Sequence, residues 1–202
     1  MQNLSDHVAY AQSLYQALRN DPFYRCLENS IENESGRQDA MLAYYQLSMQ
    51  DAARWGRLTL SEDGSHGAAV WALPLDAEAA EQRHAERGAA LKVALGAQAS
   101  ETYARMARSI SKREAEFDLG DFWYLSILGV DPGQQGRGLG AQLLRPVLDE
   151  ADAAGRTSFL TTFSPGNIKF YEGLGYQCRA VFPEPVTGAE FSVLIRPARS
   201  TS

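Results

Sequence analysis

The stretch LSILGVDPGQQGRGLG, residues 125–140, passes from a strand into a helix through a glycine-rich turn. Residues 122–130 are apolar on both alternating faces, which is typical of a central strand covered on both sides. From Gly138 to about Ala154 the apolar residues recur at helical spacing. We therefore expect a buried strand, a tight turn and a helix, in that order.

Three glycines at the start of the predicted helix make the turn suited to an anion. Gly136, Gly138 and Gly140 carry no Cβ, so backbone N–H groups can approach a ligand closely. The N-terminus of the helix adds about half a positive charge. A connection that binds nothing needs only one glycine, so the sequence favours a phosphate-bearing ligand here.

Two other phosphate-binding motifs fit the turn less well. A P-loop requires Lys and then Ser or Thr where this chain has Leu139 and Gly140. A dinucleotide-binding fingerprint requires G-x-G-x-x-G, whereas Gly136, Gly138 and Gly140 give G-x-G-x-G. An NAD-binding Rossmann variant stays as an alternative, although such a turn normally opens the first βαβ unit and this one comes late in the chain.

The remaining sequence predicts a mixed order of helices and strands. We expect helices at 8–18, 37–53, 76–118 and 165–173, and strands at 57–60, 68–73, 157–163, 176–182 and 190–196. Asn20, Asp21 and Pro22 end the first helix. The helical segment 76–118 is expected to break near Gly88 or Gly96. This order is α+β with a βαβ unit inside it.

Composition and charge limit the partners. The chain has 202 residues and a formal net charge of -6, so we do not expect it to bind the phosphate backbone of nucleic acids. Cys26, Cys178 and the three histidines match neither a zinc spacing nor a disulfide framework, so we expect no metal. No stretch approaches the roughly 18 apolar residues of a membrane span. We expect one domain over residues 1–202, cytoplasmic and without a membrane partner, and leave the oligomeric state open, with a homodimer as one option.

The segment Gln135-Gly136-Arg137-Gly138-Leu139-Gly140 resembles the Q/R-x-x-G-x-G/A signature of the GNAT acetyltransferase superfamily. The flanking segments 128–132 and 170–176 resemble its neighbouring motifs, in register. The resemblance covers a core at 122–176, whereas residues 1–118 match only in their order of elements. It implies a three-layer α+β fold with a mixed, mostly antiparallel central sheet flanked by helices, and a helical insertion before the cofactor-binding strand.

The same resemblance implies an activity and a set of cofactor contacts. The protein is expected to transfer an acetyl group from acetyl-CoA to a primary amine, on a small molecule or peptide, by direct attack in a ternary complex without a metal. The glycine loop would hold the CoA pyrophosphate, and the strand end would bind the pantetheine arm and stabilise an oxyanion. The implied cofactor-binding residues are Leu128, Gly129, Val130, Gln135, Gly136, Arg137, Gly138, Leu139, Gly140, Ala141, Ser164 and Asn167.

Tyr171 occupies the position at which such enzymes offer a phenol to the departing CoA thiolate. A thiol with a pKa of about 8.5 and a phenol with a pKa of about 10 are close enough to share a proton. The alternative is that Tyr171 only packs beside Phe170 and Tyr176, and we expect those two rings in the core.

The chain departs from the family pattern at two positions. The family often has a CoA-contacting Asn where this chain has Ser164, and Asn167 either takes over that contact or begins a helix. The family often has a Glu as general base where this chain has Thr161. The general base is therefore left open among Asp118, Asp121, Glu116 and a water relay.

These two departures from the family pattern leave a second function open, that of a regulatory module that binds CoA without catalysing a reaction. If the protein is an enzyme, we expect the segment 76–118 and the first two helices to form the walls of the acceptor site. The stripe of Tyr103, Met106, Ile110 and Phe117 would pack on the core. Acidic residues on the opposite face would favour a cationic amine, namely Glu101, Glu114 and Glu116.

Overall fold

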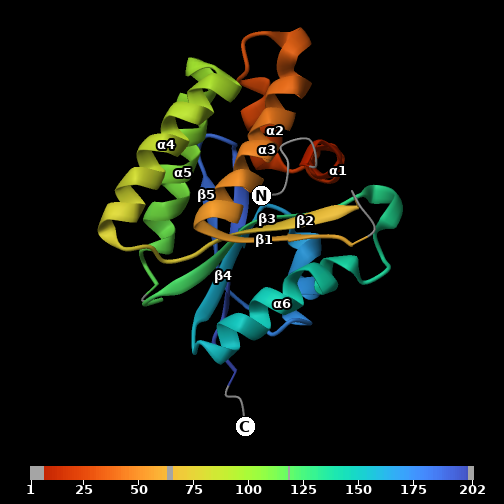
Figure 1. Ribbon diagram of the computed structural model, residues 1–202, viewed down its shortest axis with the longest axis vertical. Helices are drawn as coiled ribbons and strands as arrows, with labels where there is room; N and C mark the ends of the chain where they lie inside the picture. The colour runs from red at the N-terminus through yellow and green to blue at the C-terminus, as the bar shows by residue number, and fades with distance from the viewer. Residues whose placement is uncertain (1–6, 63–65, 118, 200–202) are drawn as a thin grey trace.

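A six-stranded mixed sheet runs through the centre of the computed structural model, which describes residues 7–62, 66–117 and 119–199 (Figure 1). The strands are β1 Gly56–Leu60, β2 Gly67–Ala72, β3 Phe122–Val130, β4 Thr157–Thr162, β5 Gln177–Glu184 and β6 Ala189–Arg196. Their order is β1-β2-β3-β4-β6-β5, with β3 and β4 parallel and the other pairs antiparallel. This confirms the predicted mixed, mostly antiparallel sheet.

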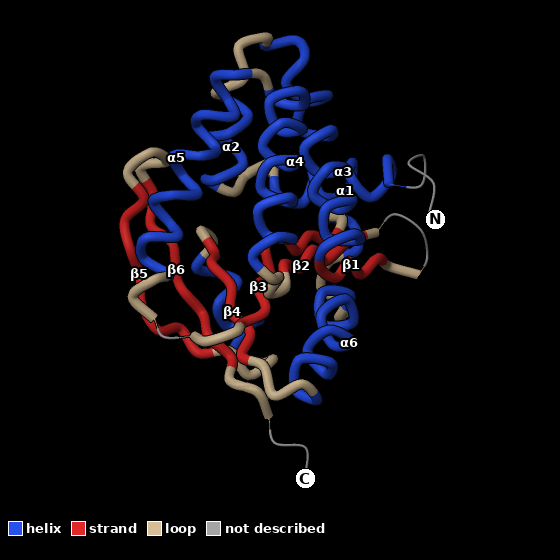
Figure 2. The backbone as a smooth tube through the Cα atoms, turned by 60° about the vertical axis from the view of Figure 1, so that its left-hand side comes forward, coloured by secondary structure: helices blue, strands red, loops and turns tan. Residues whose placement is uncertain are grey.

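Helices cover both faces of the sheet, as predicted. They are α1 His7–Leu18, α2 Pro22–Asn29, α3 Arg37–Trp55, α4 Ala77–Leu95, α5 Ala97–Glu114, α6 Leu139–Ala153 and α7 Ile168–Glu172. On the side of β1–β3, helices α1 and α3 lie against one face and α6 lies against the other (Figure 1). Figure 2 shows β5 and β6 extending the sheet beyond β4, with α5 beside them.

The helical insertion before β3 is present as two helices, and the break lies at Gly96. Gly96 has φ +82°, a left-handed conformation that favours glycine, whereas Gly88 lies inside α4. One helix was not expected from the sequence. Asp21 and Pro22 end α1 and also begin α2, because Pro22 is its first residue and the Asp21 carboxylate accepts a hydrogen bond from the Phe23 N–H at 2.9 Å.

A bulge in β3 divides that strand into two halves. Val70 of β2 pairs with Ile127 and Trp71 pairs with Leu125, so Ser126 is an extra residue, and its hydroxyl donates to the Val70 carbonyl at 3.0 Å. Leu125 packs on the α6 side of the sheet and Ile127 packs on the α1 and α3 side. The bulge therefore exchanges the two faces of the strand. Pairing with β4 also ends at Leu125, so the second half of β3 leaves β4.

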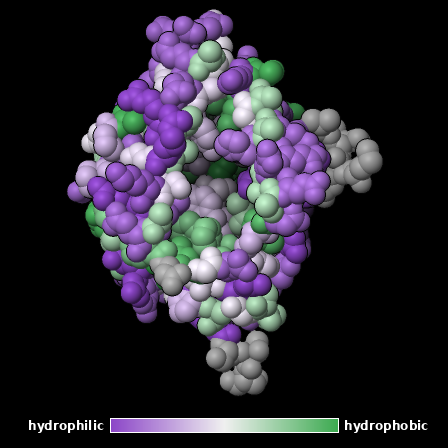
Figure 3. All heavy atoms as spheres, turned by 90° about the vertical axis from the view of Figure 1, so that its left-hand side faces the viewer, coloured by the Kyte–Doolittle hydropathy of each residue, from purple (hydrophilic) through white to green (hydrophobic). Residues whose placement is uncertain are grey.

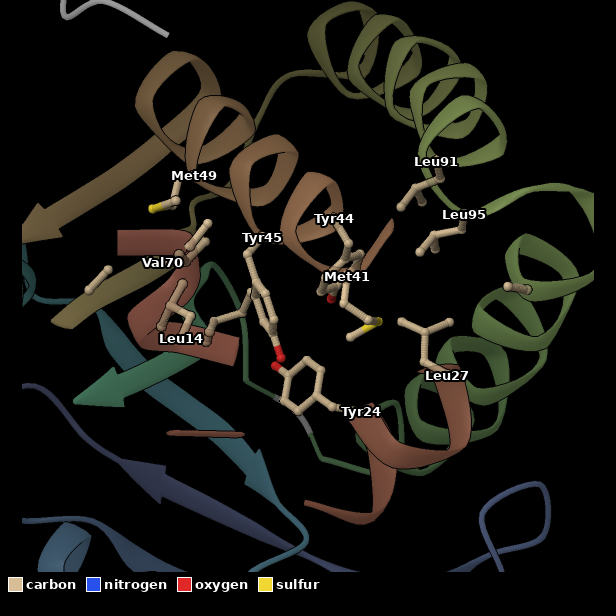
Figure 4. Close-up of a cluster of buried hydrophobic side chains, with 14 of the residues drawn as sticks. Leu14, Tyr24, Leu27, Met41, Tyr44, Tyr45, Met49, Val70, Leu91 and Leu95 are labelled. Atoms are coloured by element: carbon tan, nitrogen blue, oxygen red, sulfur yellow. The ribbon is translucent and has the colours of Figure 1, made fainter. Parts of the chain in front are cut away.

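The helices on the α1 and α3 side form a core of their own over the sheet. Figure 4 shows Tyr24 from α2 and Tyr45 from α3 pointing toward one another, and their ring centroids are 5.5 Å apart. Leu91 and Leu95 of α4 point into the same cluster (Figure 4). Because α2, α3 and α4 share this apolar cluster, they are held as one rigid wall above β2 and β3.

A buried ion pair ties the last strand to α6. The Arg196 guanidinium of β6 donates to both carboxylate oxygens of Asp152 at 2.7 and 2.6 Å, and the two side chains are 4% and 11% exposed. These hydrogen bonds hold the pKa of Asp152 below its usual value. The paired carboxylate therefore stabilises the fold at neutral pH.

We predict that Asp152→Asn lowers the free energy of unfolding by about 3 to 5 kcal/mol, because it leaves the buried Arg196 charge without its partner. The control Asp121→Asn breaks the exposed pair with Arg156 and should change stability by less than about 1 kcal/mol. Urea unfolding at several pH values measures both. Because the pKa of Asp152 is depressed in the folded protein, the difference in unfolding free energy between wild type and Asp152→Asn should be full at neutral pH. It should shrink as pH falls through that pKa. Equal losses of stability in Asp152→Asn and Asp121→Asn would contradict a stabilising role for the buried pair.

Candidate active site

The glycine loop leaves the first turn of α6 open. Gly136 and Gly138 have φ +78° and +81°, and Gly138 is the N-cap of α6 without a side-chain cap. A Cβ added at either residue would meet nothing within 4 Å, so crowding does not require these glycines. The left-handed backbone does. Gln135 anchors the loop by donating from its side-chain amide to the Val130 carbonyl at 3.0 Å.

A groove of about 390 Å³ lies between this loop, β3 and α1. Many of the residues predicted to bind the cofactor line it, namely Leu128, Gly129, Val130, Gln135, Gly136, Gly138, Leu139, Gly140 and Asn167. Arg137 and Ala141 are not among the lining residues. The Arg137 guanidinium donates to the Gln134 side chain at 2.9 Å on the surface.

Phe170 lies at the wall of this groove, not in the core where the sequence placed it. Its side chain is 37% exposed, and its ring atom Cζ is 3.1 Å from the position that a Cβ on Gly140 would take. A larger residue at position 140 would therefore displace the ring. Tyr176 is 2% exposed, which confirms the expected core position.

A second hollow of about 270 Å³ opens where β3 leaves β4. Its sheet side includes Tyr124, Ser126 and Thr161, and residues of α1 to α5 and the connection before α2 form the opposite wall. Rings surround much of it, from Phe23, Tyr24, Tyr44, Tyr103, Tyr124, Phe163 and Tyr171. Figure 3 shows the molecule hollowed near the centre of the face that it presents, with a hydrophilic rim and hydrophobic side chains deeper in.

The two hollows meet at a small set of shared residues. Both are lined by Ala17, Leu18, Leu128, Asn167 and Tyr171. Tyr171 is 7% exposed; burial raises the pKa of its phenol, and the nearby Tyr176 and Asp21 raise it further. The phenol therefore stays protonated at physiological pH and is a hydrogen-bond donor.

Asn167 and Ser164 lie near this junction. Asn167 lines both hollows and Ser164 lines only the second one. Asn167 begins α7, but its side chain makes no capping hydrogen bond there. The Asn167 side chain therefore does not cap the helix, which was the structural alternative to a cofactor contact in the sequence analysis.

One carboxyl group lines the second hollow and a second one is enclosed nearby, and neither is a base candidate from the sequence. Asp21 lines it and accepts the capping hydrogen bond of α2, and burial raises its pKa. Glu114 lies one helical turn after the lining residue Ile110, and its Oε1 is enclosed without a hydrogen-bond partner. Burial raises the pKa of Glu114 to about 7. Its charge is close enough to act on Tyr124.

The base candidates from the sequence lie elsewhere. Asp121 pairs with Arg156, and Glu116 pairs with Arg113, both on the surface. Asp118 lies outside the described residues. Thr161, at the position of the family's usual Glu, has its hydroxyl 3.2 Å from that of Tyr124. Tyr124 and Thr161 thus lie together on the hollow, whereas Glu114 is not among its lining residues.

The α5 stripe packs on the core, as predicted: Met106 and Ile110 are buried in apolar clusters, and Tyr103 and Phe117 pack against them. Tyr103 and Ile110 also line the hollow, a place that was expected for the opposite, acidic face of the helix. Glu101 faces solvent in a pair with Arg108. The apolar stripe itself lines the hollow because α5 stands beside the place where β3 and β4 part, a tertiary feature that helical spacing does not carry.

Among the described residues, no helix is long and apolar enough to cross a membrane. Within the same residues, His, Cys, Asp and Glu side chains do not gather in groups of three or more that could hold a metal ion. Cys26 and Cys178 are both free thiols.

Comparison with known proteins places these features in a family. The family model described as "Acetyltransferase (GNAT) family" matches residues 57–176, from β1 to the end of α7 and the following turn. A histone acetyltransferase HPA2-related protein of Corynebacterium glutamicum has a similar fold, with a TM-score of 0.67 at 18% identity over 100% of this chain and 96% of that one.

Two further solved structures share the fold at low identity. A mutant of agmatine N-acetyltransferase gives a TM-score of 0.61 at 16% identity, covering 96% of this chain and 95% of that one. Arylalkylamine N-acetyltransferase 2 of Aedes aegypti gives 0.56 at 14% identity, covering 94% and 95%. The family match spans more than half of the chain and includes the glycine loop and Tyr171. This protein belongs to the GNAT acetyltransferase family.

Proposed function

We propose that the protein is an N-acetyltransferase that transfers an acetyl group from acetyl-CoA to a primary amine in a ternary complex. One observation carries this proposal: the groove beside the glycine loop and the second hollow meet at Tyr171. Two adjoining hollows fit two substrates held at once. Two proteins of similar fold are named for amine acceptors, agmatine and arylalkylamines, which agrees with the proposal.

The residues of the groove fit acetyl-CoA. The uncapped first turn of α6 leaves N–H groups for a phosphate, and Gly136 and Gly138 keep the approach open. Residues 126–130 of β3 have no pairing with β4, so their backbone groups on that side are available to an amide-rich pantetheine arm. When bound, acetyl-CoA supplies a thioester-linked acetyl group and a thiolate as leaving group.

Tyr171 is proposed to assist the leaving group. Its phenol lies at the junction of the two hollows and is held protonated by burial. The raised pKa makes complete proton transfer to a thiolate less favourable than the sequence analysis assumed. The phenol therefore acts mainly as a hydrogen-bond donor that stabilises negative charge on sulfur.

Glu114 is proposed to take a proton from the acceptor ammonium, directly or through water. A carboxyl group with a pKa of about 7 is partly ionised at neutral pH and binds a proton readily, as a general base requires. Its Oε1, which has no hydrogen-bond partner, and its electrostatic effect on the pKa of Tyr124, a residue of the hollow, support this role. The base would then come from α5 and not from β4.

The experiment that tests the function is incubation with acetyl-CoA and a panel of primary amines while thiol release and acetylated product are measured. We expect equimolar thiol and N-acetyl product, and initial-rate lines that intersect, as for a ternary complex. Binding of acetyl-CoA with no product from any amine would contradict the proposal and favour the regulatory module.

We predict that acetyl-CoA raises the Tm of the wild type and that Gly138→Val abolishes this rise, because the side chain would stand where a phosphate must approach. The control Gly155→Val follows α6 at φ +65° with nothing within 4 Å, so it carries similar backbone strain away from the groove. Differential scanning fluorimetry with and without acetyl-CoA measures the shift. A normal acetyl-CoA-induced Tm shift in Gly138→Val would mean that the glycine loop is not part of the cofactor site.

Tyr171→Phe should lower kcat by about 10² or more with little change in CoA affinity, since only the hydroxyl group is lost. Tyr176→Phe is the matched control, because its hydroxyl is also buried but the ring lines neither hollow. Steady-state kinetics and calorimetric titration with CoA measure both quantities. Normal turnover in a folded Tyr171→Phe protein would reduce Tyr171 to a packing residue.

Glu114→Gln should remove the acidic limb of the kcat/KM profile, which in the wild type rises with pH through about 7. The same variant should be more stable than wild type at pH 8. The pKa of Glu114 is higher in the folded protein than in the unfolded chain, so protonation of this carboxyl stabilises the folded state at low pH. Up to about 3 kcal/mol of this stabilisation is lost in the wild type as pH rises from about 4.5 through about 7, and the neutral Gln side chain does not lose it.

The stability difference should be much smaller at pH 5, where the folded protein holds Glu114 protonated. Glu101→Gln, exposed on the same helix, should change neither the profile nor the stability appreciably. An unchanged acidic limb in Glu114→Gln would assign the base to another group.

A further inference from the structure

Arg87 places a positive charge on the α4 wall of the second hollow, and its contacts are all long. Its guanidinium is 3.4 Å from the Asp51 carboxylate, 3.4 Å from the Ser48 hydroxyl and 3.5 Å from the Tyr103 hydroxyl. Arg83 holds the same Asp51 much more closely, with Nε at 3.0 Å and NH2 at 2.6 Å from Oδ2. Asp51 is therefore primarily the partner of Arg83.

The charges of this cluster do not balance. Two guanidiniums share one carboxylate, which leaves one positive charge, and arginine does not lose its proton in proteins. Arg87 is the less exposed of the two, with 18% of its side chain exposed against 27% for Arg83. Only Arg87 lines the hollow. A buried charge is costly unless it is paired, so a negatively charged ligand group would be favoured beside Arg87.

The part of the second hollow near Tyr171 carries an acidic group instead. Asp21 lines the second hollow near Tyr171 and is close enough to that phenol to affect its pKa. Arg87 instead lies among Tyr44 and Tyr103, on the helical wall. The second hollow thus presents a carboxyl group near the reacting groups and a guanidinium on α4, with aromatic rings around the space.

We propose that the acceptor is an amino acid or a close derivative that carries a free carboxylate as well as its amine. Arg87 binds the carboxylate and the amine is placed beside Asp21 and Tyr171, while the aromatic lining contacts an apolar or aromatic side chain. This inference rests on the proposed acetyl transfer. The amine nitrogen forms an amide bond to the acetyl carbon and the C–S bond breaks; of the two protons that the ammonium loses, one ends on the CoA sulfur and the other reaches solvent through Glu114.

A purely structural role for Arg87 would be to fasten α4 to α3. Arg83 already performs that role through its close hydrogen bonds to Asp51, and it lies outside the hollow. Arg83→Gln leaves Asp51 to Arg87 alone, so it keeps the guanidinium on the wall but removes the excess positive charge. Arg87→Lys keeps the charge and serves as the conservative variant.

The test compares L-phenylalanine with 2-phenylethylamine, which lacks the carboxylate, for wild type, Arg87→Gln, Arg87→Lys and Arg83→Gln. We expect wild-type kcat/KM to favour phenylalanine by about 10- to 100-fold, the range of a charged hydrogen-bonded contact. Arg87→Gln should erase that preference. Arg87→Lys and Arg83→Gln should each keep part of it, because the first variant keeps the charge and the second keeps the guanidinium. Calorimetric titration of phenylalanine into the CoA-bound protein should show binding that is lost only in Arg87→Gln.

Each outcome decides a separate claim. Acetylation of both compounds at equal rates by the wild type, or an undiminished preference in Arg87→Gln, would overturn the carboxylate subsite and leave acetyl transfer intact. Carboxylate-dependent binding with no acetylation of any amine would overturn the proposed function and leave the subsite. If Arg87→Gln does not fold, the wild-type preference for phenylalanine and calorimetry with Arg87→Lys decide the question. Weaker binding of phenylalanine to Arg87→Lys than to wild type supports the subsite, and an unchanged affinity refutes it.

Discussion

The separation of β3 from β4 is the constraint on which the rest of the structure depends. Their parallel pairing ends at Leu125, where Ser126 bulges out of the register with β2 and exchanges the faces of the strand. Beyond this point β3 still pairs with β2, so it stays straight enough to carry the glycine loop to α6. The second hollow lies where the two strands part, and the unpaired backbone groups of residues 126–130 are available to the proposed acyl donor.

The helical half of the chain encloses this opening as a pocket. Helices α2, α3 and α4 share one apolar core, so Tyr44 and Arg87 are held in fixed places on the wall. The helices around the hollow also keep charges in unfavourable surroundings. Glu114 has an enclosed oxygen without a partner, and Arg87 shares its counter-charge with Arg83. Such groups reduce stability, and proteins commonly retain them where they act on a ligand.

Much of the cofactor half was predictable from the sequence. The strand before the loop, the glycines at the start of α6 and the helical pair broken at Gly96 are local signals, since each depends on side-chain period or backbone conformation. The position of Tyr171 followed from its family resemblance, and the structure places it at the junction; its catalytic role stays a proposal.

The acceptor half was not predictable in the same way. Asp21 was taken only as the end of a helix, although it caps α2 and borders the hollow. Arg87 has no distinguishing neighbours in sequence, and its importance comes from Asp51, which lies on another helix. Glu114 was expected with Glu101 and Glu116 on the helix face that shapes the acceptor cleft, and only the packing of α5 shows that Glu114 is enclosed while the other two lie in exposed ion pairs. These features depend on contacts between distant segments, which periodicity does not encode.

The central claim is that donor and acceptor enter separate hollows and meet at Tyr171. A crystal structure with a bisubstrate analogue, in which CoA is joined through an acetyl group to the amine of phenylalanine, tests it most directly. We expect phosphate oxygens at the first turn of α6, sulfur within hydrogen-bond distance of the Tyr171 hydroxyl and the carboxylate at Arg87. A CoA chain that lies outside the groove, or sulfur remote from Tyr171, would contradict it.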